Sequence, residues 1–380
     1  MSNLGQNISQ YLDKIQVSLF PSLEEKLGPL TEKHKELIAI LELVRIEEFV
    51  LESNICFGRP LADRCSIARA FIAKAFYNLP TTRDLLDRLQ CDKNLRRICG
   101  WSFGQKIPSE STFSRAFAEF SETDLANRAH ETLIVNAYKN EIVGHVADDS
   151  TAIEAREKPQ YKPEKVDLPK NRKGRPKKGE HRPKKEKTRI QKQLEMNLSE
   201  MLEDLPNGCD RGSKKNSKGY TTSWNGYKFH LSTEDNGVPL SAILTSASVH
   251  DSQVAIPLET LTAKRVQSLY TLRDSAYDVE EVKEYSKKLN HVPITDINPR
   301  RDTYLKTSLE AENKARKTLN WEPAEAIRYN GRTVAERTNA RLKDEFGGRT
   351  VRVKGHTKVF CHLMFGVLIL AADQLFSLIL

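Results

Sequence analysis

The chain has 380 residues, which is enough for two or three domains and a sizeable hydrophobic core. Hydrophobic residues make up 38% and charged residues 29%, a composition typical of a soluble globular protein. The formal net charge is +9, but residues 156–192 alone hold 16 basic and 5 acidic residues, which excludes a uniformly basic fold and indicates a polyanionic partner for one segment.

The first 140 residues are predicted to be helical. Residues 1–58 place Leu37 and Leu41 among other apolar residues at helical spacing, and residues 59–140 contain several short helical segments. One of these ends before Pro80, and Thr81 or Thr82 can cap the next helix. This succession resembles a helix-turn-helix DNA-binding domain, although an ordinary helical bundle produces the same pattern.

The pattern changes at residue 141, where apolar segments typical of buried strands begin. The predicted strands are 142–149, 227–233, 239–247, 268–274 and 291–297, and helical segments at 251–264 and 278–290 lie between the later ones. This order predicts an α/β domain with a mixed sheet over residues 141–380.

A basic insertion over residues 156–220 interrupts this domain. Its first half holds five of the 16 prolines, and almost no apolar residue precedes Ile190, so we expect a loop in this first half. One short helix is expected around Ile190–Leu205.

The last apolar stretch, Val359–Leu380, contains a histidine, an aspartate and a glutamine. We therefore expect a buried helix and no membrane span. The N-terminal residues lack the basic start and apolar run of a signal peptide. The six cysteines form no Cys-x-x-Cys pair, which argues against a disulfide scaffold or zinc ribbon and favours a reducing cytoplasm.

Three acids lie at positions that could converge at one sheet edge. Asp149 and Asp274 each end a predicted strand, and Glu336 lies on a predicted helix. Carboxylates suit Mg²⁺, and two such ions can clamp the attacking and leaving oxygens of a phosphoryl transfer. An aspartate at a strand end is commonly only a turn or cap residue, and Asp148 is an alternative to Asp149.

The helix around Glu336 has one distinctive polar face. Tyr329, Arg332, Glu336 and Lys343 fall within an arc of roughly 60° at 100° per residue, with Val334, Ala335, Thr338 and Leu342 opposite. Arginine offers a forked phosphate clamp, lysine a point charge and tyrosine a hydroxyl or a stacking surface. A solvated charged face is the simpler alternative.

This Tyr-Arg-Glu-Lys spacing resembles the signature of a group of bacterial insertion-sequence transposases, DDE enzymes with an RNase H-like catalytic domain. DSTAIEA and RDSAYD resemble the motifs of the first and second acids, and the resemblance covers roughly residues 60–375. It implies that Asp149, Asp274 and Glu336 are the catalytic triad and bind two Mg²⁺ ions, for which Mn²⁺ can substitute.

The resemblance further implies an enzyme that cleaves DNA at the ends of its element and joins them to target DNA. Double-stranded DNA, both terminal inverted repeats and target, would be the partner, and a homodimer would act in the bacterial cytoplasm at the nucleoid, with no membrane partner. A nuclease of the same fold that does not join DNA, or a catalytically silent DNA-binding descendant, remains open.

Three further groups are weaker hypotheses. Lys173, Arg175 and Lys177 surround a Gly and a Pro in a pattern that resembles an AT-hook, which inserts arginine into narrow minor grooves; a non-specific basic linker is the alternative. His250 and Asp251 could belong to the site, or Asp251 could cap the following helix. A third group, predicted to be structural and not a metal cluster, comprises His356, Cys361 and His362.

Overall fold

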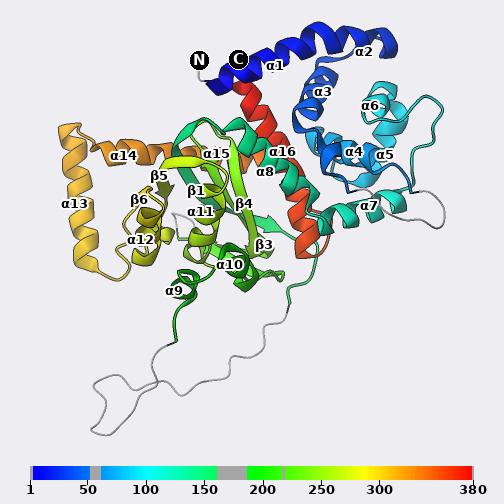
Figure 1. Ribbon diagram of the computed structural model, residues 1–380. Coiled ribbons are helices and arrows are strands. Elements are labelled where there is room, and N and C mark those ends of the chain that lie inside the picture. The colour runs from blue at the N-terminus through cyan, green and yellow to red at the C-terminus, as the bar shows by residue number, and fades with distance from the viewer. Residues whose placement is uncertain (1–2, 52–60, 161–185, 216–218, 379–380) are drawn as a thin grey trace.

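The computed structural model describes residues 3–51, 61–160, 186–215 and 219–378 (Figure 1). In the described part of the first 140 residues the regular elements are helices, and a sheet with helices on both faces follows. The described helices of the first part are α1 (Asn3–Lys14), η1 (Ile15–Leu19), α2 (Phe20–Leu27), α3 (Glu32–Val44), η2 (Ile46–Phe49), α4 (Arg64–Phe76), α5 (Thr82–Cys91), α6 (Lys93–Ile98), α7 (Glu110–Glu122) and α8 (Leu125–Ala137).

Local sequence signals explain where these helices begin and end. Helix α4 ends before Pro80, and Thr81 caps α5 by accepting a hydrogen bond from the amide of Asp84. The Asp84 carboxylate accepts in turn from the amide of Thr81, which completes a capping box. Of the two threonines considered, Thr81 is therefore the cap.

The sheet has six strands among the described residues, in the order β2-β3-β1-β5-β6, with β4 also paired to β3. β1 is antiparallel to β3 and parallel to β5. The strands are β1 (Ile142–Glu154), β2 (Asp210–Lys215), β3 (Thr221–Glu234), β4 (Pro239–Ser246), β5 (Gln267–Arg273) and β6 (Val292–Thr295). The five predicted strands are present, and the prediction of a mixed α/β fold is confirmed.

The second half of the insertion is more ordered than the sequence predicted. Two short helices, α9 (Arg189–Gln193) and α10 (Leu198–Asp204), replace the single expected helix. They are followed by β2, whose polar sequence DRGSKK gives no strand signal. β2 forms because its backbone pairs with residues 221–226 of β3, so main-chain hydrogen bonds stabilise it without apolar alternation.

Alternate residues of the sheet face two different helical layers. On β4, Ile243 packs with Val254 and Leu258 beneath α11, whereas Ala242 and Leu244 belong to the core that contains α16. The remaining described helices are η3 (Asp251–Gln253), α11 (Ala255–Ala263), η4 (Ser275–Tyr277), α12 (Glu280–Lys288), α13 (Thr303–Leu319), α14 (Ala324–Tyr329), η5 (Asn330–Arg332), α15 (Thr333–Asp344) and α16 (His356–Ser377).

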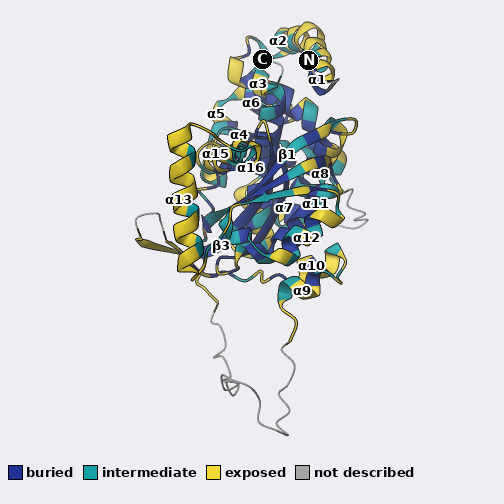
Figure 2. Ribbon diagram, turned by 90° about the vertical axis from the view of Figure 1, so that its left-hand side faces the viewer, coloured by how far each residue is buried: buried dark blue, intermediate teal, exposed yellow. Residues whose placement is uncertain are grey.

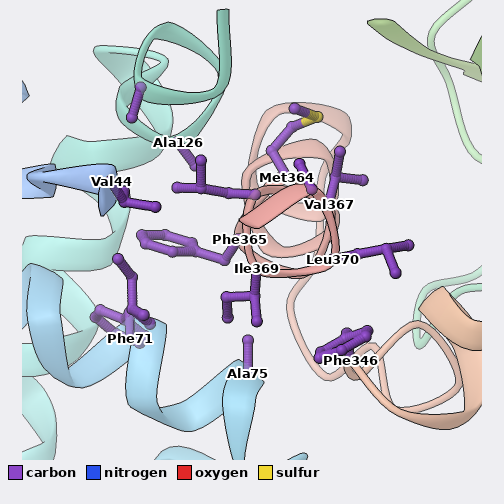
Figure 3. Packing of buried hydrophobic residues seen from close by; sticks show 14 of the residues in the cluster. Val44, Phe71, Ala75, Ala126, Phe346, Met364, Phe365, Val367, Ile369 and Leu370 are labelled. Carbon is purple, nitrogen blue, oxygen red and sulfur yellow. The ribbon is translucent and has the colours of Figure 1, made fainter. Parts of the chain in front are cut away.

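Helix α16 connects the helical region to the sheet. It is long and apolar enough to cross a membrane, but 72% of its most apolar window is buried inside the protein, as expected for a core helix. Figure 3 shows Phe365 of α16 beside Phe71 of α4, and their ring centroids are 5.8 Å apart. One continuous apolar core therefore includes α4, α7, α8, α16 and one face of the sheet.

Helix α13 differs from every helix of that core because it has no buried residue. It lies at the periphery, and Figure 2 shows it almost entirely exposed. The division of the chain at residues 58 and 140 into separate domains stays a prediction. The five described cysteines are free thiols.

Candidate active site

The register of two parallel strands brings the first two acids together. Asp148 of β1 pairs with Arg273 of β5, so the next residues, Asp149 and Asp274, follow side by side. Pairing with β5 stops at this point, but β1 continues along β3 to Glu154. The prediction that Asp149 closes the first strand was therefore wrong in detail: the strand ends there only with respect to β5.

The side chain of Asp149 faces helix α15 and is largely buried, with 17% exposed. One carboxylate oxygen accepts a hydrogen bond of 2.9 Å from Asn339 Nδ2, and the other lies 3.7 Å from an Arg332 nitrogen. Burial raises the pKa of Asp149 to about 6, although the Asn339 bond and the charges of Arg332 and Lys214 act to lower it. This carboxylate is thus poorly solvated and short of positive charge.

Asp274 caps the short helix η4, where its Oδ1 accepts from the amide of Ala276 at 2.9 Å. Burial raises the pKa of Asp274, and the negative charge of Asp251 adds to the effect. The charge of Asp274 also raises the pKa of Asp149. The two acids are therefore electrostatically coupled, and each would gain from a cation placed between them.

Glu336 lies one helical turn beyond Arg332 and is the most exposed of the three acids, with 55% of its side chain accessible. Its Oε1 accepts from Arg332 Nη2 at 2.6 Å. The same guanidinium approaches Asp149, so Arg332 bridges the first and third acids. Burial acts against the charged guanidinium, but Tyr329, Glu336 and Asp149 outweigh it and raise the pKa of Arg332.

The polar face predicted around Glu336 is present, although the short helix η5 interrupts it. Ala335, Thr338 and Leu342 are buried against the sheet as expected. The Arg332 guanidinium lies 5.8 Å from the Tyr329 ring centroid. Lys343 is half-buried, and burial together with nearby Arg349 lowers its pKa.

The residues of this face fit a divalent metal ion by their chemistry. Asp149, Asp274 and Glu336 supply hard carboxylate oxygens, and Arg332 already holds a positive charge between two of them. In the described part of the chain, however, no three His, Cys, Asp or Glu side chains lie close enough to share one ion. Glu336 would have to leave Arg332 and turn inward to complete the set.

Sequence reasoning missed two residues beside the acids. Asn339 donates to Asp149 from the boundary between the polar and buried arcs of α15, and that boundary position was the only available signal. Lys214, whose charge lowers the pKa of both aspartates, comes from the unpredicted strand β2. Its approach depends on strand pairing that the polar sequence does not reveal.

A fourth acid, Asp251, is neutralised within the protein. Its Oδ1 accepts from Lys228 Nζ at 3.1 Å and lies 3.9 Å from His230. Burial would raise the pKa of Asp251, but these two groups outweigh it and lower the pKa overall. The cap of η3 is His250, whose Nδ1 accepts from the amide of Ser252, so the suggestion that Asp251 is the cap was wrong.

Asp148, the neighbour of Asp149, belongs to a closed network on the opposite face of the sheet. Its carboxylate accepts from Arg273 at 2.7 Å and from Ser232 at 2.6 Å. Arg273 is fully buried and also donates to Glu259 at 2.9 Å and to Ser286 at 3.1 Å. Both carboxylate oxygens of Asp148 therefore accept hydrogen bonds within the protein, and Asp148 is not available to bind a ligand.

The remaining sequence hypotheses differ in outcome. His356 and His362 each hydrogen-bond a backbone carbonyl of a different segment, Leu244 and Gly347, and Cys361 is buried in the core. These contacts are structural. The AT-hook-like residues Lys173, Arg175 and Lys177 lie outside the described residues.

Comparisons with known proteins bear on this geometry. A family model described as Transposase DDE domain matches residues 145–371, which is more than half of the chain. The chain belongs to the DDE transposase family. A second model, described as Transposase domain (DUF772), matches residues 22–119 of the transposase. No curated protein and no solved structure gave a significant match.

Family membership identifies the type of fold and the general chemistry of the site. The mixed sheet of the transposase behind its helical region is an RNase H-like domain, as the sequence predicted. The family is one of phosphoryl-transfer enzymes that bind DNA and generally use divalent metal ions.

Proposed function

We propose that this protein cleaves DNA at the ends of its own insertion sequence and transfers the cut strands into target DNA. The observation that supports this most directly is the placement of Asp149 and Asp274 side by side at the ends of paired parallel strand segments, with Arg332 linking Asp149 to Glu336. A metal-dependent phosphoryl-transfer site requires carboxylates that are partly buried and whose negative charge the protein does not fully neutralise.

Asp149, Asp274 and Glu336 would hold two Mg²⁺ ions, for which Mn²⁺ could substitute. Bound there, the ions would supply activation of water and neutralise charge that develops on the phosphodiester. The remaining work falls to side chains. Asn339 orients Asp149 through its 2.9 Å hydrogen bond, and the burial of Asp149 keeps bulk water from competing for its oxygens.

The cationic residues of the helix face would hold the scissile strand. As a guanidinium, an ammonium and a neutral phenol, Arg332, Lys343 and Tyr329 are poor metal ligands but good partners for phosphate and sugar. Hydrolysis of one phosphodiester leaves a 3′-hydroxyl, and that oxygen then attacks a target phosphorus while the target's own 3′-oxygen leaves. No covalent protein intermediate is needed.

Further parts of the proposal come from the sequence. Residues 59–140 would contact the terminal repeats, and two ends require two active sites, which favours a homodimer in the bacterial cytoplasm at the nucleoid. Lys173, Arg175 and Lys177 would grip A·T-rich duplex or, as a basic linker, phosphates of any sequence.

The test is a strand-transfer assay with purified protein in Mg²⁺. Its labelled duplex is taken from the inverted repeats that flank the reading frame, with a supercoiled plasmid as target. Asp149→Asn, Asp274→Asn and Glu336→Gln should each lower cleavage at least about 10³-fold while DNA binding persists. Comparable cutting by one variant would remove that residue from the triad.

Two other results would contradict the proposal as a whole. Cleaved but never joined product would identify a nuclease. Binding without any metal-dependent cleavage by the wild type would identify a silent descendant.

A further inference from the structure

A basic cavity of about 570 Å³ lies between the N-terminal helices and the segment that follows α15. Its walls come from α4, the start of α5, α7, residues 350–354 and the first turns of α16. Phe71, Phe117 and Phe365 form its apolar floor, and Figure 3 shows two of them, Phe71 and Phe365, beside each other. These three side chains belong to the continuous core.

Positive charge dominates this cavity. Six basic side chains line it against one acid, Glu110, among the described residues: Lys74, Arg83, Arg156, Arg352, Lys354 and Lys358. Arg83 pairs with Glu110 at 2.9 Å. The other five form no ion pair with a described residue. Such an excess of cations in a concave site attracts an anionic ligand.

Lys74 is the residue that most needs such a ligand. It is 9% exposed and makes no side-chain hydrogen bond or ion pair with any described residue. Burial lowers the pKa of Lys74 to about 8. A buried, unpaired ammonium is costly to the folded protein, and Lys74 lines the cavity, so an anion bound there would offset this cost.

The cavity also has a structural link to the end of α15, the helix that carries Glu336. Arg352 and Lys354 lie eight and ten residues beyond the end of α15, and Asn78 of the α4–α5 turn donates to the carbonyl of its last residue, Asp344, at 2.8 Å. Glu336 to Asp344 spans about 12 Å of helix at ~1.5 Å per residue. That length corresponds to roughly three or four nucleotides of one strand.

We infer that this cavity binds the backbone phosphates of the DNA strand a few nucleotides from the bond that the carboxylates cleave. The inference rests on the proposed function and adds a second, metal-independent anchor to it. Arginine forks and lysine ammonium groups suit phosphate oxygens, and contacts to phosphate fix the register of a duplex without reading its sequence.

The experiment measures binding of a fluorescein-labelled duplex by anisotropy over a salt series, in EDTA so that no cleavage occurs. The test variant is Arg352→Ala/Lys354→Ala/Lys358→Ala. Its matched control, Lys264→Ala/Lys287→Ala/Lys288→Ala, removes the same charge from exposed lysines outside the cavity. The test variant should flatten the slope of log K against log salt by roughly 2–3, and the control by much less, because each lost phosphate contact removes about 0.9.

A second variant, Lys74→Met, separates ligand binding from a structural role. It should weaken duplex binding while leaving the protein as stable as the wild type or more so, because the buried charge is gone. A structural lysine would instead lower stability on substitution, and that result would overturn the assignment of Lys74.

The remaining outcomes are distinct. If both triple variants lose affinity equally, or neither slope changes, the cavity proposal is wrong while the proposed function stands. If the wild type binds no duplex at all, the proposed function itself fails. If inorganic phosphate raises the melting temperature through Lys74 but the duplex slope is unaffected, the site takes free phosphate and the DNA assignment is overturned.

Discussion

Asp148 and Asp149 are adjacent on β1 and chemically identical, and burial raises the pKa of both, yet they occupy opposite faces of the sheet and have different partners. Asp148 lies beneath α11 and α12, paired with the fully buried Arg273. Asp149 lies beneath α15, with one amide donor and a guanidinium 3.7 Å away. Since side chains alternate along a strand, one residue of register decides which acid is structural and which is available for chemistry.

The same division holds on β5, where Arg273 faces inward and Asp274 follows at the strand end. The inward pair locks the two central strands to each other. It thereby sets the spacing of the two outward acids. Two consecutive residues on each strand thus have different roles. Asp148 and Arg273 form a closed network that stabilises the fold, whereas Asp149 and Asp274 form an open side that lowers its stability.

The largest effect on stability is expected from breaking the closed network around Arg273. Arg273→Met leaves Asp148 and Glu259 buried without their cation, and it should lower the free energy of unfolding by about 3–5 kcal/mol. Urea denaturation followed by circular dichroism measures this. The exposed Arg97→Met is the control and should stay within about 0.5 kcal/mol of the wild type. Equal losses for both variants would show that the network is not a special source of stability.

A change in stability of opposite sign is expected from substituting Asp149, on the open side. The pKa of Asp149 is raised from 3.8 to about 6, so the folded protein holds this proton more tightly than the unfolded chain. Stability contributed by the protonated form is complete below about pH 4 and is lost as pH rises towards 6, by ~3 kcal/mol at ~1.4 kcal/mol per unit. In EDTA at pH 8, Asp149→Asn should therefore be more stable than the wild type by up to about that amount.

Denaturation at several pH values checks this prediction, because the variant should lose the fall in stability between pH 4 and 6. Asp148→Asn provides the comparison within the same dipeptide. It should destabilise the protein, since it removes a charge that Arg273 needs. If both substitutions changed stability in the same direction, the contrast between the two faces would be refuted.

The smallest effect is expected on the rate of strand joining, from substituting Lys343 at the edge of the open side. Lys343 shares the polar face of Glu336, and no described residue pairs with it. Lys343→Ala should slow strand joining about tenfold, equivalent to ~1.4 kcal/mol in the barrier, with unchanged unfolding. Lys314→Ala, on the exposed helix α13, is the control in the same joining assay. Unfolding of the Lys343 variant would assign the residue to structure.

Much of this arrangement could be predicted because it is local. Apolar segments located five of the six described strands, proline and threonine located the start of α5, and helical spacing placed Ala335, Thr338 and Leu342 against the sheet. The motif set around Asp149, Asp274 and Glu336 predicted the transposase family, which the family match to residues 145–371 confirms. The roles of the individual acids stay a proposal.

Other features depended on contacts between distant segments. β2 exists because β3 offers unpaired backbone, and it carries Lys214 to the two aspartates. The Arg332 bridge and the Asn339 bond join residues some 190 positions apart in the sequence. The basic cavity likewise assembles α4, α7 and α16 around Lys74.

For this protein, the amino-acid sequence alone predicted five of the six described strands, the family and the candidate acids, because hydrophobic periodicity and short motifs are properties of neighbouring residues. Only the tertiary structure decided that Asp148 is enclosed by Arg273 while Asp149 is left facing Arg332. The physical reason is that a strand's pleat sends adjacent side chains to opposite faces, and which face receives a buried cation depends on the strand and helices that pack there.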